Sequence, residues 1–276
     1  MTTVLELKAR LDNLLSTAQR ETADIDLFAP IADREECPIC LIPLPIMNKE
    51  TIFMRCCGKS ICKGCIFKHR TTELDENKAS YLDDYKCAFC CQPPPKNDMK
   101  SLKKLAKKNN PDAFMHMATH YKEGDDGVFQ SNTKSLEMRI CAAELGLANA
   151  YALIGDYYRD GIAVERDMSK ALEFWEVAAK KGSVHAHKCL AAVHGRNEDM
   201  QTCIRHYRVV ANAGEQEAMD YLMKIYKHKL LTKDVMTQTL RAFQASNGEM
   251  KSKDRDDARK MNETLERSKK EEAKTE

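Results

Sequence analysis

Nine of the twelve cysteines in this 276-residue chain lie between residues 37 and 91, and eight of them form closely spaced pairs. Two cysteines separated by two residues can bind one metal ion from a single tight turn, and Zn²⁺ is commonly held this way. Eight paired thiolates suffice for two tetrahedral sites, so we expect two Zn²⁺ ions. The pairs, in order, are Cys37 and Cys40, Cys56 and Cys57, Cys62 and Cys65, and Cys87 and Cys90.

Buried free thiols and disulfide bonds are the alternatives to a metal site, but neither requires this repeated spacing. Disulfides are also rare inside cells. Charged residues such as Glu6, Lys8 and Arg10 interrupt any apolar stretch that could be a secretory signal. No apolar run approaches the roughly 20 residues that a membrane span needs. We therefore expect an intracellular protein, cytoplasmic or nuclear, with no membrane partner.

The order of the paired cysteines resembles the all-cysteine variant of the RING finger of ubiquitin ligases. In that family the first and third pairs hold one zinc ion, and the second and fourth pairs hold the other. The resemblance implies a first site made by Cys37, Cys40, Cys62 and Cys65. It implies a second site made by Cys56, Cys57, Cys87 and Cys90.

The adjacent cysteines at positions 56 and 57 depart from the commonest RING pattern, which has a histidine where this chain has Lys59. A lysine ammonium is no ordinary zinc ligand, so we interpret both adjacent cysteines as ligands. Gly58, which follows them, can adopt the unusual backbone angles that this requires. The alternative uses one of the two cysteines together with His69 or Cys91.

A RING finger has no catalytic nucleophile. By resemblance, it binds a ubiquitin-conjugating enzyme and orients the attached ubiquitin for attack by a substrate lysine. The surface that would contact this partner includes Ile39, His69, Ala88, Phe89 and Cys91. Active members often carry arginine or lysine at the last of these positions, and a cysteine cannot replace that charged, forked donor. The alternative function is therefore a non-catalytic zinc-binding scaffold.

The second half of the chain repeats itself. Alanines recur 37, 36 and 32 residues apart, and each is followed four residues later by a larger apolar residue. Such a period is typical of two-helix solenoid units. Glycines that could end the second helix of each unit stand at Gly146, Gly182 and Gly214, with Gly248 as a looser match. The recurring alanines are Ala113, Ala150, Ala186 and Ala218.

The clearest copy of the repeat contains the phrases IGDYYRDG and AAKKG and resembles the Sel-1-like repeats of the tetratricopeptide-like superfamily. The resemblance implies a curved solenoid whose surface binds a protein or peptide client. We interpret Trp175, Tyr157 and Tyr158 as core residues between repeats. His185 and His187 are two positions apart and would point to nearly opposite sides of a helix, so they cannot share a metal ion.

The remaining segments give weaker signals. Residues 1–30 should form an amphipathic helix that packs on the repeats or self-associates, with Leu7, Leu11, Leu14, Leu15 and Ala18 on one face. Residues 96–110 form a basic linker helix without the aromatic residues that stack on bases, which speaks against nucleic acid as a partner. Residues 249–276 are densely charged and should be a solvated helix or a disordered tail.

The predicted fold is mainly α. A small zinc-stabilised RING with little β structure occupies residues 31–95, and an α-helical solenoid of about four two-helix repeats occupies residues 111–248. With 43% hydrophobic residues, the chain can bury more than one core. A net charge of +2 gives no overall field that would attract a polyanion.

Overall fold

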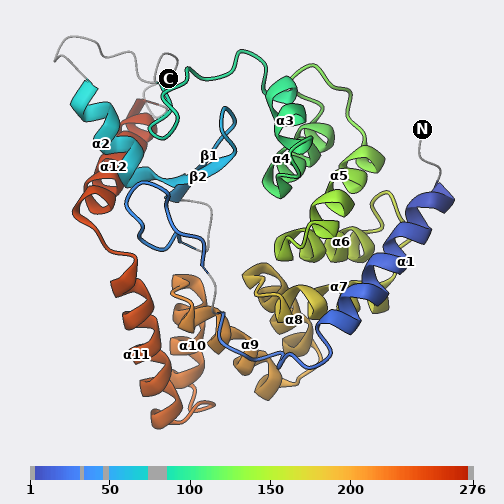
Figure 1. Ribbon diagram of the computed structural model, residues 1–276. Coiled ribbons are helices and arrows are strands. Elements are labelled where there is room, and N and C mark those ends of the chain that lie inside the picture. Colours follow the sequence, from blue (N-terminus) through green and yellow to red (C-terminus); the bar gives the residue numbers. More distant parts are fainter. Residues whose placement is uncertain (1–3, 32–33, 46–49, 74–85, 273–276) are drawn as a thin grey trace. The chain divides into compact units, whose positions relative to one another are not determined.

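The computed structural model describes residues 4–31, 34–45, 50–73 and 86–272. It is mainly α-helical with one two-stranded sheet in these ranges, which confirms the predicted fold class. The chain divides into two compact units (Figure 1). We call residues 1–33 with 97–244 the repeat unit, and residues 34–96 with 245–276 the cysteine unit. None of the described helices is both long and apolar enough to cross a membrane.

The helices and strands follow one another in the order shown in Figure 1. They are α1 (Val4–Glu21), β1 (Thr51–Met54), β2 (Lys59–Cys62), α2 (Lys63–Glu73), α3 (Asp98–Ala106), α4 (Pro111–Glu123), α5 (Asn132–Glu144), α6 (Ala148–Asp160), α7 (Met168–Lys180), α8 (Val184–Arg196), α9 (Met200–Asn212), α10 (Gln216–Lys227), α11 (Lys233–Glu249) and α12 (Lys253–Glu272).

The repeat unit is built from helix pairs. Helix α4 packs against α5, α6 against α7, and α8 against α9, and each pair also packs on the next (Figure 1). The four recurring alanines lie in the first helix of successive pairs, α4, α6, α8 and α10, and are completely buried. A methyl side chain lets two helix backbones come close together, which explains why this position stays small from one repeat to the next.

Polar side chains fix where the helices of the repeat unit begin. Asn110, Ser131, Asp167, Ser183, Asp199 and Glu215 each accept a hydrogen bond from the backbone N–H three residues later. Gly146, Gly182 and Gly214 have φ values of 88° to 91°, the left-handed conformation that was predicted for them. The looser match at Gly248 is wrong, because α11 continues through that residue to Glu249.

Helix α1 packs on α5 and α7, which confirms the first of its two predicted roles. Its apolar stripe is buried, with Leu11 fully inaccessible. Two ion pairs flank the stripe: Arg10 to Glu144 at 2.8 Å, and Lys170 to Asp12 at 2.6 Å. Because the apolar face of α1 is already covered by the repeats, the helix does not need a second copy of the chain to bury it.

Trp175 is the only tryptophan of the chain and lies at the centre of the repeat core, 1% exposed. Its indole Nε1 donates a hydrogen bond to the carbonyl oxygen of Ala152 at 3.1 Å. A Cβ atom on Gly155 would lie only 2.6 Å from this nitrogen, so the glycine leaves room for the indole. Tyr157 and Tyr158 are also buried, which confirms that these aromatic residues are core.

A pair of buried histidines joins the third helix pair. His187 in α8 and His206 in α9 are fully buried, and their Nδ1 atoms lie 3.0 Å apart. One ring must donate its N–H and the other must accept with an unprotonated Nδ1, so the two rings cannot both be charged. Burial lowers the pKa of His187 to about 4, and burial together with nearby positive charge lowers the pKa of His206 to about 3.

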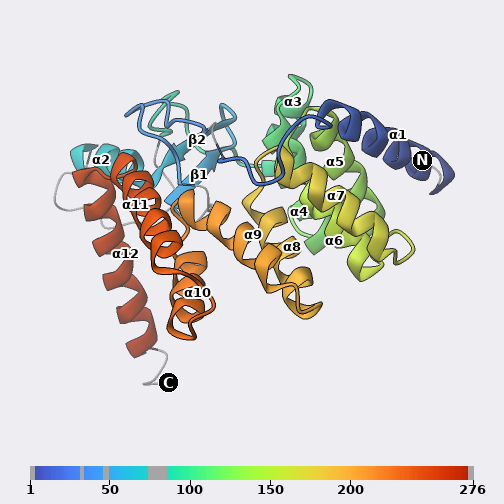
Figure 2. The same cartoon turned by 90° about the horizontal axis from the view of Figure 1, so that it is seen from below.

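The cysteine unit contains a short antiparallel hairpin, β1 with β2, followed at once by α2. Helix α12 lies beside α2 in both views (Figures 1 and 2). Among the residues that the structure describes, the apolar cluster around the cysteines is small: besides buried cysteines it contains Leu44, Ile61 and Ile66. So few large apolar residues cannot stabilise a domain of this size by themselves, which indicates that another source of stability is needed.

Candidate metal centre

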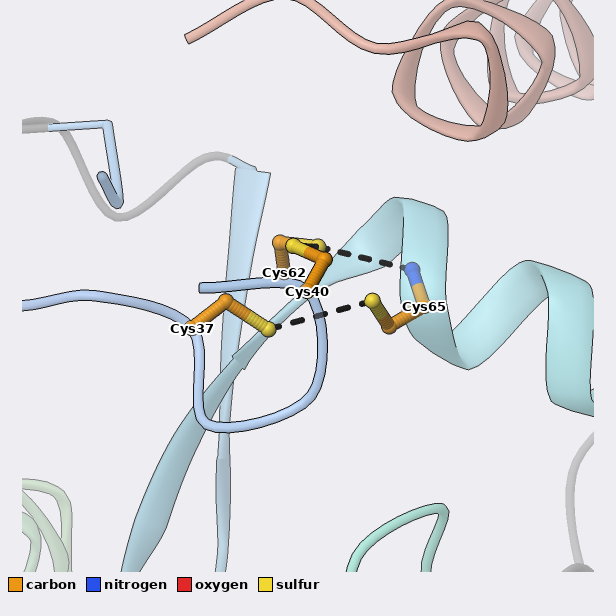
Figure 3. A group of neighbouring side chains, drawn as sticks. All are labelled: Cys37, Cys40, Cys62 and Cys65. Carbon is orange, nitrogen blue, oxygen red and sulfur yellow. Dashed lines mark hydrogen bonds between the residues drawn. The ribbon is translucent and has the colours of Figure 1, made fainter. Parts of the chain in front are cut away.

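The first cysteine quartet is assembled from three elements. Cys37 and Cys40 lie on one loop, Cys62 ends β2, and Cys65 lies in the first turn of α2, with their side chains directed toward one another (Figure 3). The sulfur atoms of Cys37 and Cys65 are 3.8 Å apart, and those of Cys40 and Cys62 are 3.9 Å apart. All four sulfurs lie within 4.8 Å of one another.

The second quartet joins the tip of the hairpin to a later loop. Cys56 and Cys57 lie in the turn between β1 and β2, and Gly58 follows them with φ 73°, as the sequence predicted. The sulfur of Cys57 lies 3.9 Å from that of Cys87, and the sulfur of Cys56 lies 3.5 Å from that of Cys90. The first pair therefore meets the third, and the second pair meets the fourth.

These separations fit a tetrahedral metal ion. Four thiolates at a Zn–S distance of about 2.3 Å are about 3.8 Å from one another. A disulfide bond would bring two sulfurs to about 2.05 Å, and all of these cysteines are free. Four sulfur donors converging on one point are suited to a soft or borderline ion such as Zn²⁺. Both quartets can therefore hold a metal ion.

The loop that carries Cys37 and Cys40 and the loop that carries Cys87 and Cys90 have the same backbone pattern. The N–H of Leu41 donates to the carbonyl of Cys37, and the N–H of Cys91 donates to the carbonyl of Cys87, both at 2.9 Å. Leu41 and Cys91 have φ values of 56° and 57°, in the left-handed region that non-glycine residues rarely adopt. This shared turn directs both sulfurs of each pair to the same side of the loop.

Without a cation, burial keeps several thiols of the quartets protonated. Burial, reinforced by neighbouring sulfurs, raises the pKa of Cys56 and Cys65 far above the usual thiol range. Burial also raises the pKa of Cys57 to about 11. At Cys37 burial opposes ionisation too, but hydrogen bonds from backbone N–H groups, led by that of Cys40, lower its pKa to about 7. A divalent cation would allow all four sulfurs of a quartet to be thiolates.

Arg255, at the start of α12, is buried beside the first quartet with 4% of its area exposed. Its guanidinium donates to the carbonyl oxygens of Pro43, Ile42 and Met250 at 2.8, 3.1 and 3.0 Å. It also lies 3.8 Å from the sulfur of Cys40. Arg255 thus supports the loop that carries two candidate ligands and places a positive charge next to their thiolates.

The sequence did not identify Arg255, because the segment from residue 249 onward appears uniformly charged and solvated. The first two turns of α12 are instead partly buried, with Arg255 4% and Ala258 5% exposed. The one available signal was an arginine followed three residues later by an alanine on the same face of a helix. That signal is too weak to predict a contact with a loop more than two hundred residues earlier.

The other predicted site residues lie outside the quartets. Lys59 is exposed on β2, and neither His69 in α2 nor Cys91 belongs to a quartet. Ile39 and Phe89 sit between the two cysteines of their loops with 41% and 44% of their areas exposed. Cys91 is exposed as well, whereas Ala88 and His69 are half-buried.

No protein-family model matches the chain. Among curated proteins it is 32% identical over 117 residues to "Chitin synthase regulatory factor 3" of Schizosaccharomyces pombe, covering 36% of this chain. It is 34% identical over 68 residues to "E3 ubiquitin-protein ligase GW2" of Oryza sativa subsp. indica and of subsp. japonica, covering 25% of this chain. In each case the match spans only 13% of the relative's length.

Two solved structures are similar to the chain at 26% identity. One is a Sel1 repeat protein from Oxalobacter formigenes, with a TM-score of 0.45 over 62% of this chain and 66% of the other. The second is a protective antigen of uropathogenic Escherichia coli displaying an SLR fold, with a TM-score of 0.46 over 57% of this chain and 34% of the other.

Proposed function

We propose that the cysteine unit is a RING-type zinc finger that binds two Zn²⁺ ions and recruits a ubiquitin-conjugating enzyme, so that the protein acts as a ubiquitin ligase. The observation that carries this proposal is the interleaved convergence of the four cysteine pairs, with sulfur separations of 3.5 to 3.9 Å. The similarity to a rice protein named as an E3 ubiquitin-protein ligase supports it.

The zinc ions in this proposal are structural. They would be held by the two cysteine quartets and would join loops that the small apolar core cannot hold together. Ligase activity then requires no nucleophile from this chain. Its residues would bind the conjugating enzyme and restrict the orientation of the attached ubiquitin, which lowers the entropic cost of reaching the reactive geometry.

The contact surface for the conjugating enzyme would be formed by the two CxxC loops. Ile39 and Phe89 are large apolar residues held exposed by rigid turns, and exposed apolar residues of this kind are typical of protein contacts. The contact surface would also include His69, Ala88 and Cys91, as the resemblance to RING fingers implies.

The repeat unit would select the client. Stacked helix pairs present an extended surface suited to a protein or peptide, and we propose that residues 111–248 are Sel-1-like repeats. We also retain the predicted division of the chain, with a basic linker over residues 96–110 and a charged segment from residue 249, as a proposal.

The second candidate function is a non-catalytic zinc scaffold. It is favoured by Cys91, which occupies the place where active RING fingers often have a basic residue. Its side chain is exposed but can offer only a weak S–H donor to a partner. A scaffold would bind the same two metal ions and the same client but would not promote transfer of ubiquitin.

Two measurements test the proposal. Metal analysis of the full chain should find two zinc ions per molecule, and one or none would contradict the finger. Incubation with activating enzyme, ubiquitin and a panel of conjugating enzymes should yield ubiquitin chains, with at least a tenfold loss in Ile39→Ala. Ile25→Ala is the matched control, because Ile25 is 40% exposed and lies in the repeat unit. Inactivity with every conjugating enzyme would leave only the scaffold.

A further inference from the structure

Three side chains of different chemistry converge on the surface of the repeat unit, outside the cysteine quartets. The Nε2 atom of His185 lies 2.7 Å from Oδ2 of Asp156 and 3.6 Å from the sulfur of Cys189. The same sulfur lies 3.7 Å from Oδ1 of Asp156. The two carboxylate oxygens of Asp156 thus face a nitrogen and a sulfur that also face each other, and one donor atom from each residue lies within 4.8 Å of the other two.

The fold holds these groups in place from two rigid elements. His185 and Cys189 are four residues apart on α8, so one helical turn brings both to the same face. Asp156 comes from α6, the first helix of the preceding pair, which contacts α8 directly. The positions of the three side chains are therefore set by helix packing, so little order has to be created when a ligand binds.

The arrangement does not suit a nucleophilic triad. In a triad the histidine receives the nucleophile's proton on one ring nitrogen while an acid holds the other nitrogen. Here the carboxylate and the thiol both approach Nε2 of His185, so they compete for a single ring position. Convergence of several donors on one point is the geometry of a cation site.

The distances agree with this interpretation. In a tetrahedral zinc site, with bonds of about 2.0 Å to oxygen and nitrogen and about 2.3 Å to sulfur, sulfur lies about 3.5 Å from the other two donors. The sulfur of Cys189 lies 3.6 Å from Nε2 of His185 and 3.7 Å from Oδ1 of Asp156, close to this value. The oxygen and nitrogen would be about 3.3 Å apart. The Nε2 atom instead lies 2.7 Å from Oδ2, the other carboxylate oxygen, because these two atoms share a hydrogen bond, which a metal ion would replace.

We propose that Asp156, His185 and Cys189 form a metal site for a divalent transition ion of the zinc class, independent of the cysteine unit. The set contains three protein donors, so the fourth position of a tetrahedral ion is left for water or for a donor atom of a bound partner. The His185 side chain is 41% exposed, which gives an ion access from solvent. Arg159 also contacts Asp156, at 3.3 Å, but its closer partner is Asp160 at 2.7 Å. It can therefore remain paired when the metal binds.

The test uses the full chain purified with zinc and then titrated with Co²⁺, whose absorption reports thiolate ligation. Wild type should bind one more equivalent of metal than Cys189→Ser or His185→Ala, and the wild-type spectrum minus that of either variant should show a thiolate band. Because the site is measured as a difference between wild type and variant, the result does not depend on how many ions the cysteine unit holds. Unchanged circular dichroism would show that the variants are folded.

Two controls separate this site from general metal binding. Cys141→Ser removes a half-buried cysteine of the same unit. The sulfur of Cys141 contacts the guanidinium of Arg10 at 3.6 Å. His194→Ala removes another histidine of α8, whose Nδ1 atom pairs with Asp199 at 3.2 Å. Both controls should bind as much metal as wild type. Equal binding by wild type and Cys189→Ser, or an equal loss in the controls, would overturn the proposal and leave an ordinary ion pair beside a thiol.

Discussion

Replacing Arg255 by methionine should release zinc from the cysteine unit although no cysteine is changed. The side chain is buried and donates to three backbone carbonyl groups, two of them on the loop that carries Cys37 and Cys40. Methionine keeps much of the side-chain volume but removes the charge and every donor. The loop would then lose its attachment to α12.

The magnitude follows from these contacts. A hydrogen bond from a charged donor contributes about 1.5 to 3 kcal/mol, and breaking a buried charged network commonly costs about 3 to 5 kcal/mol. Three bonds of 2.8 to 3.1 Å place Arg255 in that range, because the contributions are not additive and the freed carbonyls can partly rehydrate. Since metal binding and folding are coupled, a loss of about 3 kcal/mol corresponds to about 100-fold weaker zinc binding.

Competition with a chromogenic zinc chelator measures this effect. Arg259→Ala is the matched control on the same helix: its partner is Glu50 at 3.0 Å, but its side chain is 52% exposed, so the change should cost less than about 1 kcal/mol. Arg255→Lys keeps the charge without the fork and should be intermediate. If Arg255→Met retains zinc as firmly as the Arg259→Ala control, the argument that α12 supports the first quartet fails.

Three further outcomes are expected. The buried His187 and His206 have pKa values below the unfolded value of about 6.5, so stability should be complete above that pH and should fall toward pH 4. The slope should reach about 1.4 kcal/mol per pH unit for each histidine, and a flat denaturation profile would contradict it. Gly64→Ala should raise helix propensity yet destabilise the cysteine unit by more than about 1 kcal/mol, because the new Cβ would lie 2.7 Å from the backbone nitrogen of Arg255; unchanged or higher thermal stability would argue against this packing. Cys91→Arg should raise ubiquitin-chain formation several-fold at no added backbone cost, since position 91 already has a positive φ; equal rates would show that it is not the bridging position.

The features that sequence could predict are those encoded within a few residues. CxxC pairs identify candidate ligands locally, and the repeat period identifies small residues such as Ala150 that are buried between helices. Helix starts such as those at Asn110 and Asp167 are also encoded locally, because a capping side chain accepts a hydrogen bond from a backbone N–H three residues away. Which pairs share an ion was implied by a resemblance, since spacing alone does not determine it.

The features that sequence missed depend on contacts between distant segments. Arg255 gives no local sign that it is buried, because an arginine in a charged stretch normally stays in solvent. In the cluster of Asp156, His185 and Cys189, the four-residue spacing of His185 and Cys189 is visible in the sequence, but two donors alone do not indicate a metal site. The contribution of Asp156 could not be anticipated, because it requires knowing that α6 and α8 are neighbours.

The single indole of the chain provides a built-in optical probe. Trp175 is enclosed by the repeat core, and the cysteine unit contains no tryptophan. Selectively excited emission therefore reports on the helical array alone, whatever happens to the thiol-rich part. Comparing this emission with a chelator's colour change during the same denaturation would show whether the two halves of the molecule melt together or one after the other.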